Sequence, residues 1–294
     1  MSDSVLDTIQ KKIFLLDGAM GTEMMKAGLG HGECPEAWNL DRPEAVKDIE
    51  RRYYEAGSDA VVTNTFGGNP IKLAAYGLER RCRELNLAAA RLAREVRPEG
   101  RFVGGDMGPT GKFIKPMGEY EEAQFEEAFA VQAAALDEGG VDFFIMETMY
   151  DLREALCAVR ACRKVSSLPV FATMTFSKSP RGFFTLMGDR PSKCLKALEQ
   201  EGAAAVGANC FLDSEAMVEL VKIMRPETGL PLIAQPNAGQ PEIHSGKDVA
   251  YSQSQEEYIR HIPQIIQNGA RIVGGCCGTD PGTIRRIAEI LKKT

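Results

Sequence analysis

Apolar residues along the chain fall into short continuous runs that alternate with longer stretches of helical periodicity. In four places an amphipathic stretch ends at a glycine and an apolar run follows within a few residues, as in EAGSDAVVTN from Glu55 and EGAAAVGANC from Glu201. A glycine just past a helix end supplies a left-handed C-cap, and a continuous apolar run is typical of a strand buried on both faces. Each place is therefore predicted to be a junction from a helix to a strand.

Eight such apolar runs occur, and each is predicted to be a strand. Besides the four at the junctions, further runs begin at Ile13, Arg101, Pro169 and Pro231. Helical periodicity lies between the runs, over residues 43–56, 119–136, 152–165, 214–224, 255–267 and 281–291. Strict alternation of strands and helices predicts a parallel sheet, and eight units in 294 residues predict closure into a (βα)8 TIM barrel. We therefore expect a single α/β domain over residues 1–294.

The alternative α/β architecture is an open doubly wound sheet. That fold predicts a glycine-rich phosphate-binding turn after the first strand and an acidic residue at the end of the second. The segment DGAMGTE from Asp17 has its glycines at a different spacing, and the second apolar run ends in Thr63 and Asn64. The barrel is therefore favoured.

Composition excludes several classes of function. Hydrophobic residues make up 44% and charged residues 26%, which is typical of a globular protein. A net charge of -6 with scattered lysines and arginines argues against a nucleic-acid partner. No segment approaches the ~18 consecutive apolar residues of a membrane-spanning helix. The first ten residues lack the features of a signal peptide, so we expect a cytoplasmic protein with no membrane partner.

The chain has eight cysteines, which a reducing compartment would keep as free thiols. Cys82, Cys157, Cys162 and Cys194 fall in or near helical stretches, where a free cysteine packs as a small apolar residue. Cys34 lies in a loop, and the sequence assigns it no role.

Polar or reactive residues stand where the predicted strands end. The active sites of TIM barrels lie at the carboxyl ends of the strands, so position alone nominates these residues. In chain order they are Asp17, Asn64, Asp106, Glu147, Thr175, Cys210, Asn237, Cys276 and Cys277.

The strongest chemical signal is cysteine at the ends of the sixth and eighth strands, in GANC and GGCCGT. One strand separates these two in a closed barrel, a gap of roughly 10 Å that converging side chains can span. The glycines beside Cys276 and Cys277 let the backbone leave the strand, so that both side chains can face one point. Three thiolates favour Zn²⁺ and leave a fourth position for substrate, which is typical of a catalytic site. We therefore predict that Cys210, Cys276 and Cys277 bind one zinc ion and activate a small thiol.

Other uses of these cysteines are three unligated buried thiols or a vicinal disulfide between Cys276 and Cys277. Hydrolytic zinc chemistry is a further alternative, but such sites usually use histidine and carboxylate ligands. The three histidines, His31, His244 and His261, fall in loops or a helix and not at strand ends.

Two strand-end carboxylates, Asp17 and Glu147, suit the ammonium group of an amino acid, although capping of the following helix is the commoner role. The turn DGAMGT from Asp17 adds backbone N–H groups suited to a carboxylate. Asn64 lies in a predicted rim loop, where it either forms the turn or contacts the substrate.

Seven segments, LLDGAMGTE, EAGSDAVVTNTFGG, GDMGPTG, MET, GANC, PNAG and GGCCGTDP, together resemble the motifs of the homocysteine S-methyltransferase family over nearly the whole chain. The resemblance is greatest to the homocysteine-binding barrel of cobalamin-dependent methionine synthase. It implies a methyltransferase that converts homocysteine to methionine. In that scheme Cys210, Cys276 and Cys277 hold zinc, homocysteine sulfur takes the open position, and the amino-acid end contacts Asp17, Gly18, Ala19 and Glu147.

The family divides by methyl donor among methylcobalamin, S-methylmethionine or S-adenosylmethionine, and betaine. The motifs GDMGPTG and PNAG favour the synthase-like branch, so the expected donor is methylcobalamin on a partner corrinoid protein or domain. A sulfonium donor is the alternative, while betaine should need an aromatic cage and Trp38 is the only tryptophan. A different class of function also fits: a non-catalytic thiol-binding subunit of a corrinoid methyl-transfer system.

Overall fold

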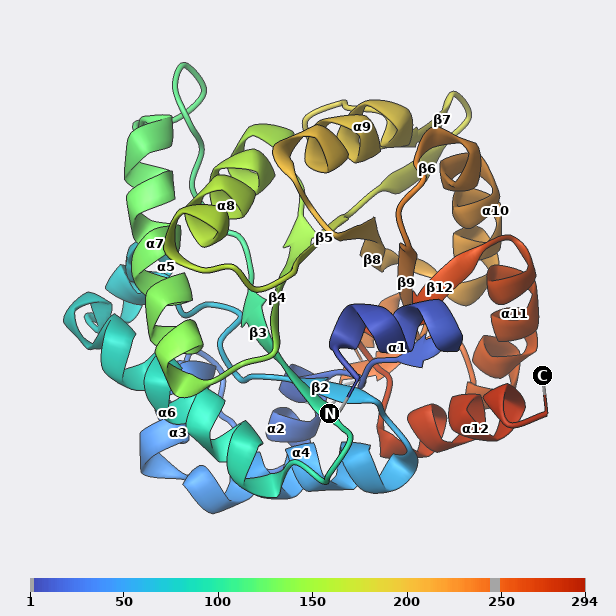
Figure 1. The fold of residues 1–294 in the computed structure, drawn as a ribbon, viewed down its shortest axis with the longest axis horizontal. Helices are drawn as coiled ribbons and strands as arrows, with labels where there is room; N and C mark the ends of the chain where they lie inside the picture. Colours follow the sequence, from blue (N-terminus) through green and yellow to red (C-terminus); the bar gives the residue numbers. More distant parts are fainter. Residues whose placement is uncertain (1–2, 244–248, 294) are drawn as a thin grey trace.

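Eight parallel strands form the barrel of the computed structural model, which describes residues 3–243 and 249–293 (Figure 1). Their order in the sheet is β1-β12-β9-β8-β5-β4-β3-β2, which follows the chain around the barrel and confirms the predicted fold. The strands are β1 (Phe14–Leu15), β2 (Ala60–Val62), β3 (Phe102–Met107), β4 (Phe143–Met149), β5 (Val170–Met174), β8 (Ala205–Asp213), β9 (Leu232–Asn237) and β12 (Ala270–Val273).

Backbone and side-chain hydrogen bonds close the seam between β1 and β2. The backbone N–H of Asp59 donates to Leu15 O at 2.7 Å, and the Asp59 carboxylate accepts the Leu15 N–H at 3.0 Å. Farther along, Asp17 Oδ2 accepts the Val62 N–H at 2.8 Å. Asp17 therefore belongs both to the barrel wall and to its carboxyl rim.

Helices form an outer layer around the strands (Figure 1). Five of the six predicted helices have the predicted bounds, and the sixth, α7, begins three residues later because Glu121 and Gln124 form a capping box. The longer helices are α4 (Pro43–Ala56), α6 (Cys82–Val96), α7 (Glu122–Gly139), α8 (Leu152–Val165), α9 (Pro191–Glu201), α10 (Ser214–Met224), α11 (Gln255–Gln267) and α12 (Pro281–Leu291).

Shorter elements precede or connect the barrel strands and the longer helices. They comprise α1 (Val5–Lys11), α2 (Met20–Lys26), α3 (Trp38–Asp41), α5 (Pro70–Leu73), four 3-10 turns (Pro35–Ala37, Ala74–Tyr76, Glu79–Arg81, Arg225–Glu227), and the hairpins β6 (Ser177–Ser179) with β7 (Gly182–Phe184) and β10 (Pro241–Ile243) with β11 (Val249–Tyr251). The β10–β11 hairpin brings Tyr251 to the site described below.

An aromatic cluster fills the amino-terminal half of the barrel interior. Phe14, Phe143 and Phe171 are fully buried there, and α1 packs against them through Val5 and Ile9. In Figure 1 α1 lies across this end of the barrel. Side chains thus fill the amino-terminal half of the barrel and α1 covers it. The cavity of the barrel lies at the other end, where the strands finish.

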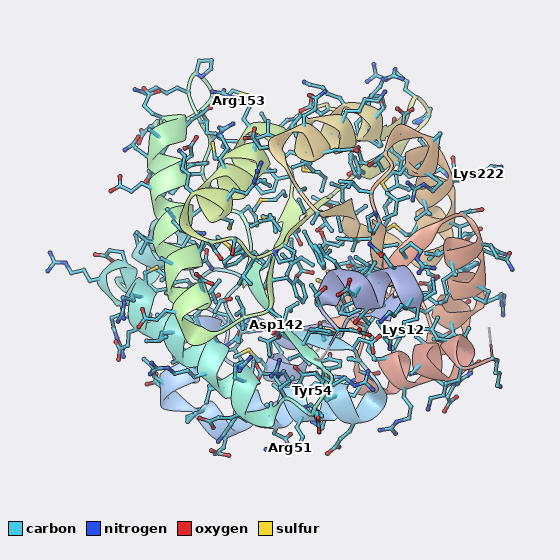
Figure 2. All side chains as sticks on the ribbon, viewed as in Figure 1. Lys12, Arg51, Tyr54, Asp142, Arg153 and Lys222 are labelled. Carbon is cyan, nitrogen blue, oxygen red and sulfur yellow. The ribbon has the colours of Figure 1, made fainter. Side chains whose placement is uncertain are left out.

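Cys82, Cys157, Cys162 and Cys194 are free and buried, as expected for packing residues, and Cys34 is also free and buried. Cys34, for which the sequence predicts nothing, places its sulfur 3.1 Å from Glu36 Oε2. Charged side chains such as Arg51 and Lys222 lie at the outer edge of the helical layer (Figure 2). Within the described part of the chain, no helix has the length and apolar character needed to cross a membrane.

A buried carboxyl group in α8 makes stability depend on pH. Glu154 is 0% exposed and accepts the Thr110 N–H at 2.7 Å, and burial raises the pKa of this carboxyl from 4.5 to about 7. A raised acid pKa stabilises the fold fully below about pH 4.5, and that contribution is lost as pH rises through 7. For Glu154→Gln, which cannot ionise, we therefore expect a gain of up to about 3 kcal/mol in unfolding free energy over wild type at pH 8.

Urea unfolding of both proteins at pH 4.5 and pH 8 measures this gain. A much smaller difference is expected at the lower pH, where the Glu154 carboxyl of the folded protein is neutral. A difference that stays constant between the two pH values would contradict the assignment.

Candidate functional site

The end of β8 leaves regular strand geometry at the first cysteine of interest. Asn209 pairs with Gln235 of β9, but the register then shifts, and the next pair is Asp213 with Asn237. Within this irregular stretch Cys210 and Phe211 have φ values of 60° and 61°. Left-handed backbone costs a non-glycine residue on the order of 1–3 kcal/mol and tends to occur at functional sites.

The end of β12 is held by backbone hydrogen bonds to the neighbouring strands. Gly275 N–H donates to Asp17 O, and Cys276 N–H donates to Pro236 O, both at 2.9 Å. The carbonyl of Cys277 accepts the Ala238 N–H, also at 2.9 Å. Gly278 follows with φ 83°, and a Cβ there would lie 2.4 Å from the Tyr251 ring. This turn places two adjacent cysteines at the same rim, as the sequence predicts.

The three cysteine sulfurs from β8 and the β12 turn converge. They lie within 4.8 Å of one another, and Cys210 Sγ is 3.8 Å from Cys277 Sγ. A tetrahedral zinc with Zn–S bonds of ~2.3 Å holds its sulfurs about 3.8 Å apart. All three cysteines are free, so Cys276 and Cys277 form no vicinal disulfide. The donor set and its spacing therefore fit a zinc ion.

Hydrogen bonds among the three sulfurs shift the pKa values of Cys276 and Cys277 in opposite directions. Accepting from Cys210 and Cys276 lowers the pKa of Cys277 to about 3. Donating to Cys210 and Cys277 raises the pKa of Cys276 well above its ordinary value. Among themselves the thiols thus stabilise one thiolate, so that three thiolates at this spacing require a compensating cation.

A cavity of about 330 Å³ adjoins the three sulfurs. Every residue that the sequence predicts for the substrate lines it: Asp17, Gly18, Ala19, Asn64 and Glu147. The wall also includes Asp106, Gln235 and Tyr251, which are additional to the prediction.

Carboxyl groups dominate the polar part of this cavity. Burial raises the pKa of Asp17 and of Asp106 well above the ordinary value, and it raises the pKa of Glu147 to about 7. Within the described residues, Asp17 Oδ1, Asp106 Oδ1 and Gln235 Oε1 accept no hydrogen bond. Buried acceptors without donors are costly, so this wall favours a ligand that brings N–H groups and positive charge.

The family model for homocysteine S-methyltransferases matches residues 14–291. The chain belongs to the homocysteine S-methyltransferase family. Methionine synthase of Mycobacterium tuberculosis is 33% identical over 302 residues, which cover 97% of this chain and 25% of that protein. Methionine synthase of Mycobacterium leprae is 32% identical over 98% of this chain and 25% of its own length. The chain thus spans about a quarter of the length of these relatives.

Solved structures show the same fold. The metallated form of the homocysteine methyltransferase MmuM from Escherichia coli superposes with a TM-score of 0.78 at 24% identity, covering 97% of this chain and 99% of that one. The carboxyl transferase domain of Rhizobium etli pyruvate carboxylase is more distant, with a TM-score of 0.56 at 16% identity over 95% of this chain and 47% of that one.

The residues predicted to bind substrate differ in how many of their hydrogen-bonding groups are already paired within the protein. Asn64 Nδ2 donates to Pro35 O at 2.8 Å and to Asn39 Oδ1 at 3.0 Å. Both amide hydrogens therefore hold a loop, which leaves only the oxygen for a substrate. In contrast, Ala19 precedes α2 without a side-chain cap, so the backbone N–H groups at this end of α2 lack a capping acceptor.

The sequence analysis assigns no function to four residues that the structure places at or beside the site. Asp106 is nominated by its strand-end position but given no function there, and Gln235 is two residues before the strand-end Asn237. Asn209 is visible only as the neighbour of Cys210 in GANC. Tyr251 comes from a hairpin that no pattern in the sequence connects with the barrel rim.

The two histidines that the structure describes, His31 and His261, take no part in the cysteine cluster. His31 is exposed, and His261 Nδ1 lies 2.9 Å from Ser214 Oγ on α10. His244 lies outside the described residues. The one group of potential ligands found among the described residues consists of sulfur alone, which disfavours the hydrolytic alternative.

Proposed function

We propose that this chain transfers a methyl group to the sulfur of homocysteine and so forms methionine. The observation that carries the proposal is the convergence of Cys210, Cys276 and Cys277 on one point of a cavity in a member of this family. The three thiolates would hold one zinc ion. When bound, zinc supplies positive charge beside the substrate sulfur and lowers the pKa of its thiol.

The chain's own residues would orient the amino acid. Asp17 and Glu147 would accept hydrogen bonds from its ammonium group, and Asp106 Oδ1 would offer a further acceptor nearby. The backbone at Gly18 and Ala19 would bind its carboxylate at the start of α2. A Cβ on Gly18 would lie 2.8 Å from Thr279 Oγ1, so glycine lets this turn sit close to the β12 end.

In the transfer, the thiol gives up its proton to solvent and reacts as a thiolate, and a sulfur lone pair forms the new bond to the methyl carbon. The bond from that carbon to the donor breaks, and its electron pair stays on the donor.

A methylated corrinoid protein or domain is our proposed donor. Identity of 33% with a methionine synthase over 97% of this chain supports the synthase-like branch. A sulfonium compound is the alternative methyl donor. The alternative function without catalysis is a subunit that binds the thiol but does not methylate it.

One assay separates these possibilities. The purified chain with zinc and homocysteine is offered methylcobalamin, S-methylmethionine, S-adenosylmethionine or betaine in parallel, and methionine is quantified. We expect methionine with methylcobalamin. Methionine with a sulfonium donor only would move the chain to the other branch, and none with any donor, despite homocysteine binding, would favour the thiol-binding subunit.

A further inference from the structure

Asn209 of β8 links the cysteine cluster to two neighbouring strands of the barrel, β4 and β5. It directly precedes Cys210 on β8 and is 0% exposed. Its Oδ1 accepts the Thr148 backbone N–H at 2.7 Å and lies 2.8 Å from the Thr173 hydroxyl, which is also 3.0 Å from Met146 O. Its Nδ2 donates to Thr148 Oγ1 at 2.9 Å and to Cys276 Sγ at 3.7 Å.

These contacts fix which end of the amide faces the sulfur. A backbone N–H can only donate, so the atom that meets Thr148 N must be the oxygen of Asn209. The NH₂ group therefore points to the Thr148 hydroxyl and to Cys276 Sγ. Within the described residues, it is the only nitrogen donor hydrogen-bonded to that sulfur.

Backbone strain surrounds this amide on two strands. Thr148, which contributes both a donor and an acceptor, has φ 60°, and Cys210, the next residue on β8, also has φ 60°. Left-handed backbone at non-glycine residues persists only where surrounding contacts fix it. The Asn209 amide bonds directly to Thr148 and supplies such contacts.

We propose that Asn209 is a positioning residue whose N–H···S hydrogen bond holds Cys276 and withdraws electron density from its thiolate. The inference rests on the proposed zinc site. Three thiolates and a substrate thiolate give a zinc centre excess negative charge, which a buried N–H donor offsets. Groups that hydrogen-bond to metal ligands typically change metal affinity or activity by ~10–100-fold.

Cobalt(II) titration of the full chain tests the role without a turnover assay. Asn209→Ala removes the donor, and Asn209→Asp keeps an oxygen for Thr148 N–H but replaces the donor with a carboxylate oxygen. For both variants we expect cobalt affinity, measured by chelator competition, to fall by ~10–100-fold. In Asn209→Ala the sulfur-to-cobalt charge-transfer band should move to longer wavelength, because the sulfur lone pairs rise in energy without the N–H.

Thr173→Val is the matched control, since it loosens the same amide on the side away from the sulfur. Its affinity and band should stay close to wild type. Wild-type affinity and band position in Asn209→Ala would overturn the inference, as would a Thr173→Val variant that reproduces both changes. If Asn209→Ala fails to fold, the cobalt affinity of Asn209→Asp tests the inference, and a wild-type value would overturn it. A wild-type chain that binds neither cobalt nor zinc would instead overturn the proposed function.

Discussion

Replacing Cys277 with alanine is expected to reduce bound zinc from about one ion per chain to a trace, because two thiolates fall short of the three protein ligands that a catalytic zinc site uses. Cys277 Sγ lies 3.8 Å from Cys210 Sγ, and it is one of the three sulfurs that lie within 4.8 Å of one another. Methionine formation should fall by more than the ~100-fold upper range seen when only a group supporting a ligand is removed. Elemental analysis and the donor assay measure the two effects on one preparation.

Cys194→Ala is the control for loss of a thiol as such. Cys194 is fully buried in α9 and stands apart from the cysteine cluster. Its substitution should cost some stability through a small cavity but leave zinc content and turnover intact. Wild-type zinc and activity in Cys277→Ala would refute the assignment of the metal ligands.

The fold follows from local signals in the sequence. Gly57 and Gly202 end their helices with φ values of 114° and 99°, so the glycine that precedes an apolar run marks the helix end. Helix α7 shows the limit of this approach, because periodicity extends to residue 119 while the Glu121 capping box begins the helix at Glu122. Caps made by side chains override periodicity at the ends of elements.

The cysteine cluster is predictable because parallel strands of a barrel end at one rim, so distant residues that end strands must be neighbours. The backbone conformation that directs the Cys210 side chain towards the cluster is not predictable from the sequence. Neither cysteine nor phenylalanine favours positive φ, yet Cys210 and Phe211 both adopt it. That conformation depends on pairing with β9 and on the Asn209 contacts to β4, which are tertiary interactions. For the same reason Tyr251, carried by a hairpin, has no signal in the sequence.

The carboxylates contribute differently, and substitution at Asp17 should separate binding from metal chemistry. Asp17→Asn keeps an oxygen for the Val62 N–H but cannot form the carboxylate that would pair with the substrate ammonium group. A hydrogen bond to a charged group contributes about 1.5–3 kcal/mol, so the KM for homocysteine should rise ~10–100-fold. Zinc content should not change, because Asp17 is no part of the sulfur cluster.

A substrate without the amino group provides the internal control. With 4-mercaptobutanoate, which keeps the thiol and carboxylate of homocysteine, wild type should lose the ammonium contact and Asp17→Asn should have little left to lose. The ratio of kcat/KM between the two proteins should therefore fall towards one with this analogue. An equal ratio for both thiols would mean that Asp17 acts through the barrel seam, where its Oδ2 accepts the Val62 N–H, and not on the ammonium group. The comparison thus distinguishes the two positions that the Asp17 carboxylate holds at once, one in the wall between β1 and β2 and one facing the substrate.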